Sequence, residues 1–471
     1  MVGVLPLQQA STLADGINNV WVLVVCFLIF FMQPGFAMLE AGQVRAKNVG
    51  NVLMKNLNDW VMGVIVFFIV GAGVTAIAGA ATTSGTAVDF GSAFSHLSDT
   101  NAGGWISWFF GAVFAMTAAT IVSGAVAGRM KFSAYVLFAA LMTAIIYPVL
   151  PGFAWGGSGL LSGAGFLGDA LGVGYLDFAG ATIVHMSGGI AGLVAAKMVG
   201  PRKGRYDANG NAQPIPGHSI LFAVLGTLIL AFGWYGFNVG TQATIISVAD
   251  DGTAAFQGAA LGRVVLVTTL GMGGGGVAAM AFSAIWQGKP DPLWTANGLL
   301  AGLVGVTGAV PHVTWWGGLG IGIVVGLLVL PAFRWTVDSL KIDDVCGVFA
   351  VHGAAGGVGT ILIPLVAAGT GGGWAPLPEG GTQLAMQIIG VLVVGTWTVL
   401  ASMAALGLIK ALVGLRVSEE EEEAGLDISE HGVNVYPEFG ASDGPVSADG
   451  GSVATREDIR TDGGTPGGDD E

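Results

Sequence analysis

Two stretches of the sequence follow one pattern: Asp177-Phe-Ala-Gly-Ala-Thr-Ile-Val-His185-Met-Ser-Gly-Gly and Asp344-Val-Cys-Gly-Val-Phe-Ala-Val-His352-Gly-Ala-Ala-Gly. Both place Val-His eight residues after an Asp and continue with small residues. Five predicted membrane helices separate the two copies, and an odd number of helices in a repeat inverts the second unit relative to the first. The pattern predicts two inverted halves that bring both histidines to one axis near the middle of the membrane.

The composition indicates an integral membrane protein. Of the 471 residues, 53% are hydrophobic and 10% are charged, and the mean hydropathy is +0.73. Glycine supplies 80 residues, which favours closely packed helices because bare backbone lets them approach. A β-barrel would show short alternating segments, whereas the apolar runs here are long and continuous.

Eleven runs are long enough to cross a bilayer, which requires about 20 mostly apolar residues. They begin near Asn19, Lys55, Trp105, Phe132, Phe178, Gly217, Gly258, Leu293, Thr314, Cys346 and Leu384. The predicted fold is therefore an all-α membrane protein with eleven transmembrane helices, arranged as two inverted five-helix repeats and one extra helix.

Charge predicts the orientation, because Lys and Arg accumulate in cytoplasmic loops. The basic residues that follow the odd-numbered predicted helices are Arg45, Lys47, Lys55, Arg129, Lys131, Lys197, Arg202, Lys203, Arg205, Lys289, Arg334, Lys341, Lys410 and Arg416. Of the basic residues in and between the predicted helices, Arg263 alone falls toward the opposite face. We expect the N-terminus outside and the C-terminus in the cytoplasm, and the first residues lack the basic segment of a cleaved signal peptide.

The chain divides into a neutral membrane domain, residues 1–417, and an acidic end. Residues 418–471 hold sixteen Asp and Glu against two Arg, a net charge of −14 that equals the charge of the whole chain. We expect 418–436 to form a cytoplasmic tail and 437–471 to be an acidic, disordered extension, because such a composition buries little apolar surface. The sequence has no basic patch for nucleic acid.

Two histidines within predicted membrane helices point to a polar conduit. An ionisable side chain in the bilayer is costly and usually faces a pathway or a partner, although a single one can simply bond to a neighbouring helix. The repeat favours the pathway, since neutral imidazoles can line it as donor and acceptor. For Glu40 and Asp59, which flank the first predicted cytoplasmic loop, we expect structural ion pairs with Arg45 and Lys47. Cys26 and Cys346 are expected to be small buried hydrophobes.

The stretch that ends at Gly189 resembles the signature of the Amt/Mep/Rh ammonium transporters. The other stretches that resemble this family are Gln33-Pro-Gly-Phe-Ala-Met-Leu-Glu-Ala-Gly-Gln-Val-Arg-Ala-Lys-Asn, Phe232-Gly-Trp-Tyr-Gly-Phe-Asn, Ala301-Gly-Leu-Val-Gly-Val-Thr and Phe349-Ala-Val-His-Gly. The resemblance covers residues 15–436 and is stronger to the bacterial and archaeal Amt branch. It implies transport of ammonium or ammonia across the plasma membrane.

The resemblance also implies a role for each matching residue. Recruitment of the cation falls to Trp155, Thr241 and Phe114, with Asp177 as support for the site. Phe114 and Phe237 correspond to a phenyl gate at the outer end of the pore. Beyond the gate, the pore is lined by His185, His352, Trp234 and Thr307.

The sequence departs from the family pattern at three places. Thr241 stands where the family often has a serine, and Gly347 stands where many relatives have an Asp. The segment between Trp155 and Asp177 is longer than usual. The contribution of the carboxylate that Gly347 lacks at the inner mouth is therefore either missing or supplied by Asp343 or Asp344.

The expected partners also follow from the resemblance. They are ammonium or methylammonium as substrate, a homotrimer, and a PII-type signalling protein at the cytoplasmic face, all in a lipid bilayer. We expect no cofactor, no metal and no enzymatic activity, because phosphate-binding loops, Ser-His-Asp patterns and metal-ligand spacings are not found. Two alternatives stay open: an ammonium sensor that signals through its tail, and a channel for neutral ammonia or carbon dioxide.

Overall fold

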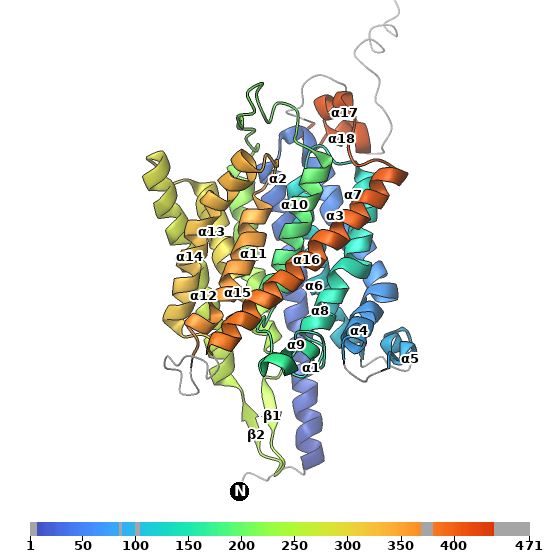
Figure 1. Ribbon diagram of the computed structural model, residues 1–471, viewed down its shortest axis with the longest axis vertical. Coiled ribbons are helices and arrows are strands. Elements are labelled where there is room, and N and C mark those ends of the chain that lie inside the picture. The colour runs from blue at the N-terminus through green and yellow to red at the C-terminus, as the bar shows by residue number, and fades with distance from the viewer. Residues whose placement is uncertain (1–6, 84–86, 99–103, 369–379, 438–471) are drawn as a thin grey trace, which may run out of the picture.

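The chain folds into a helical bundle whose long helices run between two end faces (Figure 1). The computed structural model describes residues 7–83, 87–98, 104–368 and 380–437. One end of the bundle carries α17 and α18 and is called the tail face below. The other end carries the strands β1 and β2 and is called the hairpin face.

Helices make up most of the described residues. The α-helices are α1 (Leu7–Phe30), α2 (Met32–Gln43), α3 (Val49–Val66), α4 (Ala72–Ala81), α5 (Phe90–Ala93), α6 (Gly104–Val126), α7 (Phe132–Leu141), α8 (Tyr147–Ala154), α9 (Phe166–Leu171), α10 (Ser187–Val199), α11 (Ile220–Thr241), α12 (Gly258–Gln287), α13 (Pro292–Thr307), α14 (Trp315–Arg334), α15 (Ala355–Leu362), α16 (Gly380–Leu412), α17 (Glu419–Ala424) and α18 (Leu426–His431). Strands β1 (Ile246–Val248) and β2 (Ala254–Phe256) pair antiparallel.

Nine helical runs within the described ranges are long and apolar enough to cross a membrane. The runs are Leu7–Gln43, Ala46–Ala81, Gly104–Val126, Phe132–Ala154, Ala181–Val199, Ile220–Thr241, Gly258–Gln287, Trp315–Ser339 and Gly381–Leu412. The two other predicted spans correspond to the shorter helices α13 and Phe349–Leu365. The structure therefore supports a multi-pass helical membrane protein, and the count of eleven stays a prediction.

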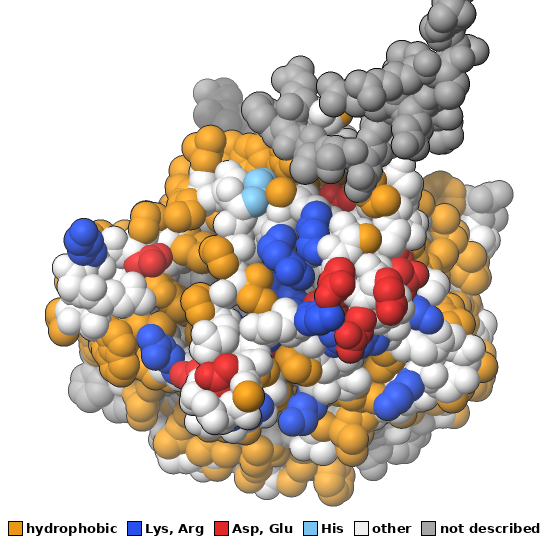
Figure 2. All heavy atoms as spheres, turned by 90° about the horizontal axis from the view of Figure 1, so that it is seen from above, with side chains coloured by type: hydrophobic (Ala, Val, Ile, Leu, Met, Phe, Trp, Pro, Cys, Tyr) orange, Lys and Arg blue, Asp and Glu red, His pale blue; other side chains and the backbone are white. Residues whose placement is uncertain are grey.

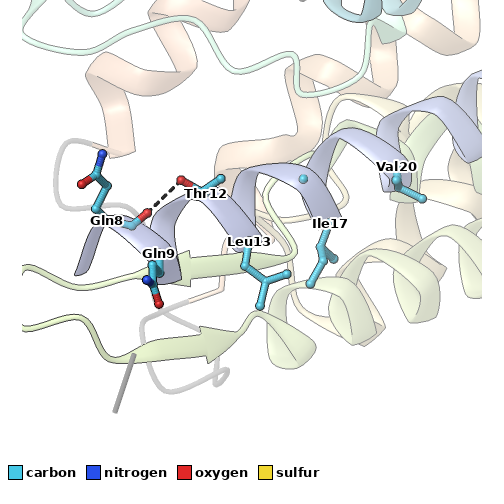
Figure 3. Close-up of a pocket in the computed structure, with 7 residues that line it drawn as sticks. Gln8, Gln9, Thr12, Leu13, Ile17 and Val20 are labelled. Carbon is cyan, nitrogen blue, oxygen red and sulfur yellow. Dashed lines mark hydrogen bonds between the residues drawn. The ribbon is translucent and has the colours of Figure 1, made fainter. Parts of the chain in front are cut away.

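The first helix begins earlier than the sequence predicts, at Leu7 rather than near Asn19. Its first turns extend toward the hairpin face, where Asn18 binds the backbone of Ile245 and Ile246 with both ends of its side-chain amide. Figure 3 shows a hollow along this extension, lined by Gln8 to Val20 of α1 alone. Hydropathy misses this segment because its helix is stabilised by contact with the hairpin and not by a continuous apolar run.

Glycine brings helix backbones into contact, as the composition predicts. A side chain at Gly322 of α14 would lie 2.2 Å from the carbonyl oxygen of Gly271 in α12, and one at Gly326 would lie 2.4 Å from that of Gly275. Only hydrogen fits in these positions, because real side-chain carbons do not approach backbone so closely. The bundle thus gains close helix packing from small residues.

The tail packs onto the bundle through backbone and side-chain hydrogen bonds. The Asn51 amide donates to the Asp427 carboxylate at 2.8 Å, and the Leu426 amide donates to Asn48 Oδ1 at 3.0 Å. Farther along, the Tyr436 hydroxyl lies 2.8 Å from the His218 ring. The predicted extension 437–471 lies outside the described residues apart from Pro437.

Candidate functional site

Both histidines lie in the same kind of local structure, a six-residue π-helical turn that leads into an α-helix. His185 belongs to Ala181–Met186, just before α10, and His352 belongs to Phe349–Ala354, just before α15. Helix α10, which continues the first turn, packs closely against the backbone of the second turn, since a side chain at Gly189 would lie 2.4 Å from the Gly353 nitrogen. This contact brings together two residues that are 167 positions apart in sequence.

The two histidine side chains form a buried pair. Their Nδ1 atoms lie 3.3 Å apart, and the rings are stacked with centroids 5.4 Å apart. One Nδ1 must carry the proton and the other must accept it, so the pair requires two different tautomers when neutral. The Nε2 atom of His185 is buried and has no hydrogen-bond partner in the described part of the chain. The pair therefore keeps a free polar atom in an apolar interior.

Aromatic rings continue from His185 toward the hairpin face. The Phe237 ring lies 5.2 Å from the His185 ring, and Phe114 lies 4.2 Å from Phe237 at an interplanar angle of 34°. Trp155 follows, with its ring 6.0 Å from Phe114 in an edge-on arrangement. Phe114 and Phe237 are buried, whereas Trp155 is 39% exposed. The series thus runs from an accessible indole, past two packed phenyl rings, to the histidine pair.

Trp234 and Thr307 support the histidine pair from α11 and α13. The Trp234 indole stacks on His185 with centroids 4.7 Å apart, and its Nε1 donates to Thr307 Oγ1 at 2.9 Å. The Thr307 hydroxyl donates in turn to the Leu303 carbonyl at 2.7 Å. This chain of bonds fixes the indole plane, and the indole fixes the His185 ring.

Asp177 holds the backbone that leads into the first histidine turn. Its carboxylate accepts hydrogen bonds from the amides of residues 180 to 183, at 2.7 to 3.1 Å, and from the Thr182 hydroxyl at 2.6 Å. Its carbonyl oxygen accepts from Trp155 Nε1 at 2.7 Å. The free amides at the start of a helix favour a carboxylate there. Asp177 therefore orients both the histidine turn and the accessible indole.

The second repeat uses Asp344 in the same way, at its tail-face end. The Asp344 carboxylate accepts from the amides of Val348 and Phe349 at 2.9 and 2.8 Å. Burial raises the pKa of this carboxyl to about 6 despite those two bonds. Gly347 has a φ of +69°, and its counterpart Gly180 has a φ of +97°, so both positions adopt the left-handed conformation that favours glycine.

Thr241 lies one helical turn after Phe237 on α11. Its hydroxyl donates to the Phe237 carbonyl at 2.8 Å, which leaves the oxygen as an acceptor. No hydrogen bond or ring contact joins Thr241 to Trp155 within the described ranges. The aromatic and histidine side chains therefore contact one another, whereas Thr241 makes no such contact with Trp155 in the part of the chain that the structure describes.

A hollow of about 520 Å³ adjoins Trp155 and Phe114. Phe110 lines it as well, and its ring lies 4.8 Å from that of Phe114. Phe110 is not among the residues that the sequence predicts for the site. Its spacing, four residues before Phe114 on α6, could have indicated the same helix face.

A second, small cavity of about 20 Å³ lies beyond His352 on the side of the tail face. Its lining includes His352, Phe36, Glu40, Asn297 and Cys346. The Phe36 ring lies 6.3 Å from the His352 ring. Sequence reasoning assigns Phe36 and Asn297 no role, because nothing in their local sequence distinguishes them from packing residues.

The expected ion pairs of Glu40 and Asp59 are wrong. Glu40 forms hydrogen bonds with Ser123 and Asn56, and the Tyr135 hydroxyl donates its one proton to the Asp59 carboxylate, whose two oxygens lie 2.8 and 2.9 Å away. Both acids lie in the bundle interior, away from the loop that holds the basic residues. Arg45 and Lys47 instead contact the tail at Glu422 and Glu423.

Cys26 and Cys346 are free and buried, as predicted. Within the described residues, no three His, Cys, Asp or Glu side chains lie close enough together to hold a metal ion.

Comparison with known proteins supplies the family. The model of the Ammonium Transporter Family matches residues 20–436. Ammonium transporter Amt1 of Haloferax mediterranei is 65% identical, over 96% of this chain and 85% of the relative. Ammonium transporter Amt2 of Archaeoglobus fulgidus is 40% identical, over 90% of this chain and 89% of the relative.

Solved structures agree with this match. A structure titled "Sensor Amt Protein" is 33% identical with a TM-score of 0.77, over 89% of this chain and 100% of that one. The crystal structure of Mep2 from Saccharomyces cerevisiae has a TM-score of 0.69 at 25% identity, over 86% of this chain and 89% of that one. The two Amt relatives from Haloferax mediterranei and Archaeoglobus fulgidus are both named ammonium transporters, and this family is not one of enzymes. The chain is a multi-pass membrane protein that belongs to the Ammonium Transporter Family.

Proposed function

We propose that the chain transports ammonium and ammonia across the plasma membrane through a pore centred on His185 and His352. The single observation that carries this proposal is the buried histidine pair, with Nδ1 atoms 3.3 Å apart, directly beneath the packed rings of Phe114 and Phe237. A polar pair in an apolar interior is costly unless it faces a partner or a pathway. Ammonia is small, and it both donates and accepts hydrogen bonds, as the pair requires.

Recruitment of the cation takes place at Trp155 with Phe114 packed against it, and Thr241 contributes its hydroxyl oxygen from the turn after Phe237. An ammonium ion over an indole face gains about 2 kcal/mol when it is partly desolvated. The exposure of Trp155 and the hollow beside it support this role. Asp177 contributes by holding the indole through its carbonyl oxygen, and its charge favours cations nearby.

Deprotonation follows at the phenyl gate. Phe114 and Phe237 are buried and leave little room for the water that an ammonium ion retains. A charged group loses more by leaving water than a neutral one, so an apolar gate favours ammonia over ammonium. The proton leaves near the gate, and ammonia passes along His185 and His352 with Trp234 and Thr307 beside it.

The proposed topology has eleven transmembrane helices, with the N-terminus outside and the tail in the cytoplasm. Lys and Arg side chains gather on the tail face (Figure 2), in agreement with a cytoplasmic location. We assign residues 1–417 to the transport domain, 418–436 to a regulatory tail and 437–471 to an acidic extension. The protein is proposed to act as a homotrimer, with a PII-type protein as the regulator of its cytoplasmic mouth.

Transport can be tested with purified protein in liposomes, by the current that an ammonium jump evokes on a solid-supported membrane. We expect a saturable current that His185→Ala and His352→Ala abolish, while both variants keep the size-exclusion profile of the wild type. His312→Ala serves as a matched control because His312 lies in a loop outside the pore. Unchanged transport in both pore variants would contradict the proposal.

A result without current also has a defined meaning. A pH-sensitive dye inside the same liposomes detects electroneutral movement of ammonia. A dye signal without a current identifies an electroneutral pore. Binding of ammonium with neither signal contradicts transport and favours a sensor.

A further inference from the structure

The feature that the proposed function leaves unused is a buried carboxyl group, Glu40, at the tail-face end of the histidine pair. Glu40 lies four residues after Phe36 on α2, so the two side chains occupy the same helix face. Only 3% of Glu40 is exposed. Together with His352 and Asn297, it lines the small cavity of about 20 Å³. A titratable group therefore faces the cavity that ammonia enters after it has passed His352.

The hydrogen bonds around Glu40 fit a carboxyl that carries a proton. Ser123 Oγ lies 2.6 Å from each Glu40 oxygen and 2.7 Å from the Thr120 carbonyl oxygen. A hydroxyl has one proton to give, and the Thr120 carbonyl can only accept. When Ser123 donates to Thr120, the short contact to Glu40 needs a donor on Glu40. A protonated carboxyl supplies that donor.

Within the residues that the structure describes, the one remaining hydrogen bond to Glu40 is long, at 3.3 Å from Asn56 Nδ2. No Lys or Arg nitrogen lies within 4.0 Å of Glu40 in the described part of the chain, so an ionised Glu40 has no direct ion pair there, although the buried Lys55 is close enough to interact with its charge. An unpaired buried carboxylate is expensive. These contacts are those of an acid that can give up its proton when a cation forms beside it.

Other titratable groups lie near Glu40 but do not line the cavity. Lys55, Asp59 and Tyr135 form a neighbouring cluster, in which Lys55 Nζ donates to the Met130 carbonyl at 3.4 Å and lies 5.5 Å from the Tyr135 ring centre. Cys346 and His352 face Glu40 across the cavity. Asp59 is thus a second buried acid of the same region, without access to the cavity lining.

The cavity also offers an unpartnered polar side chain. Asn297 is 4% exposed, and within the ranges that the structure describes its amide makes no hydrogen bond. Polar atoms buried without a partner are uncommon, and they often mark the place of a small ligand or water. About 20 Å³ is enough for one water-sized molecule.

We propose that Glu40 is the proton donor to ammonia that reaches this cavity. The proposal rests on transport through the histidine pair. Ammonia that has passed His352 takes the carboxyl proton: the Glu40 O–H bond breaks, an N–H bond forms, and an ammonium ion stands beside a carboxylate. The ammonium ion leaves to the water at the tail face, and the carboxylate regains a proton from hydronium in that water. Asn297 and Phe36 contact the ammonia molecule there.

The test compares Glu40→Gln with Asp59→Asn, since each replaces a buried acid by the amide of similar shape. Proteoliposomes with an internal pH-sensitive dye report the initial rate after an ammonium chloride pulse. General acid catalysis typically contributes at least 10²-fold, and we expect Glu40→Gln to lower the rate by about tenfold or more. Asp59→Asn should stay within about twofold of the wild type.

A second readout separates proton donation from a structural role. Infrared difference spectra, recorded with ammonium chloride against potassium chloride, should show a carboxyl band that changes on ammonium binding. The band should persist in Asp59→Asn and be absent from Glu40→Gln. A rate for Glu40→Gln within twofold of the wild type, equal losses in the two variants, or a spectrum without this band would overturn the proposal.

Two further variants keep the result interpretable. If Glu40→Gln does not fold, Glu40→Asp retains the acid but withdraws it by one methylene, and a reduced rate with a shifted carboxyl band is expected. A wild-type rate and an unshifted band would overturn the proposal. His185→Ala is measured in parallel: retained transport in that variant contradicts the pore itself, whereas lost transport there with full activity in Glu40→Gln contradicts only proton donation by Glu40.

Discussion

The two histidine-bearing segments share a backbone design but are held by different surroundings. In each, an aspartate accepts amide hydrogen bonds, a glycine three residues later has a positive φ, and a π-helical turn carries the histidine. Asp177 accepts from four amides and a hydroxyl, whereas Asp344 accepts from two amides. The first segment is thus anchored more firmly by its own capping residue.

The second segment gains an anchor that the first lacks. Asp343 precedes Asp344 and forms buried ion pairs with Arg202 and Arg205, at 2.8 and 3.2 Å, whereas the equivalent position before Asp177 is Leu176. The Arg129 guanidinium donates to the Asp343 carbonyl oxygen at 2.6 Å. One local design can therefore serve both ends of the bundle when each end supplies its own support. The Asp177 end is held by hydrogen bonds to the carboxylate and by an indole, and the Asp344 end is held by arginines.

The largest predicted difference in stability is between substitutions of the two capping aspartates, Asp177 and Asp344. Asp177→Ala leaves four buried amides without their acceptor, and each costs about 1 kcal/mol or more, so we expect a loss of about 4 kcal/mol in the free energy of unfolding. Asp344→Ala removes two such bonds and should cost about 2 kcal/mol. Equilibrium unfolding in mixed micelles measures both. The exposed residue Asp169→Ala is the control, and equal losses at the two sites would contradict the comparison.

The next largest loss of stability is expected when the ion pairs between Asp343 and its arginines are broken. Asp343→Asn leaves buried arginines without their full partner, and we expect a loss of about 3 kcal/mol at neutral pH. Burial alone would raise the pKa of Asp343, but hydrogen bonds from Arg202 and the charges of Arg129 and Arg202 hold it well below its usual range. Since the folded pKa is depressed, the stabilisation is complete above the ordinary carboxyl pKa of about 4 and is lost as the pH falls below it.

Unfolding measured from about pH 7 to pH 3 checks the sign of this effect. The difference in stability between the wild type and Asp343→Asn should shrink as the solution becomes more acidic. The exposed Asp338→Asn should leave the profile unchanged. A difference that grows toward low pH would contradict the ion-pair anchor.

A smaller difference in stability is expected between substitutions of Gly180 and Gly347, the two glycines with a left-handed backbone conformation. A side chain at Gly180 would lie 2.5 Å from the Val184 side chain, whereas one at Gly347 would lie 3.4 Å from Phe333. We expect Gly180→Ala to cost about 2 kcal/mol, from strain and overlap together, and Gly347→Ala to cost about 1 kcal/mol from strain. The same unfolding assay ranks them, and a larger loss at Gly347 would reverse our comparison.

The smallest predicted effect is on ammonium affinity and concerns Trp155, the indole that the first segment orients through Asp177. Trp155→Phe removes the bond from Nε1 to the Asp177 carbonyl, worth about 1 kcal/mol, but keeps an aromatic face. We expect the half-saturating ammonium concentration to rise roughly fivefold in the current assay. Trp397→Phe is a matched control, because its Nε1 bonds to the Ile146 carbonyl away from the pore. Similar shifts in both variants would remove the special role of Trp155.

Gly347 shows how far sequence reasoning reaches. From the sequence, Gly347 is interpreted as the loss of a carboxylate whose contribution is either missing or supplied by Asp343 or Asp344. In the structure the position requires a left-handed backbone, and Asp344 already matches Asp177 in the repeat. The alignment of the two stretches contained this answer, since Gly180 stands at the same place as Gly347.

Glu40 and Asp59 show where such reasoning fails. Their neighbours along the chain, Arg45 and Lys47, predict ion pairs, but the helices carry both acids into the interior and the tail binds the two cations instead. The partners, Ser123 and Tyr135, lie on other helices and far away in sequence. No local pattern could have identified them.

The sequence by itself determined the properties that depend on local composition and internal repetition: a helical membrane protein, an acidic tail, and two matching Asp-to-His segments. Hydropathy and spacing express these directly, because burial in a bilayer constrains each helix separately. The tertiary structure decided which side chains meet: the 3.3 Å contact of the histidine rings, the packed, tilted phenyl pair, and the cavity that joins Glu40 to His352. Such contacts depend on the packing of distant helices, which no single segment specifies.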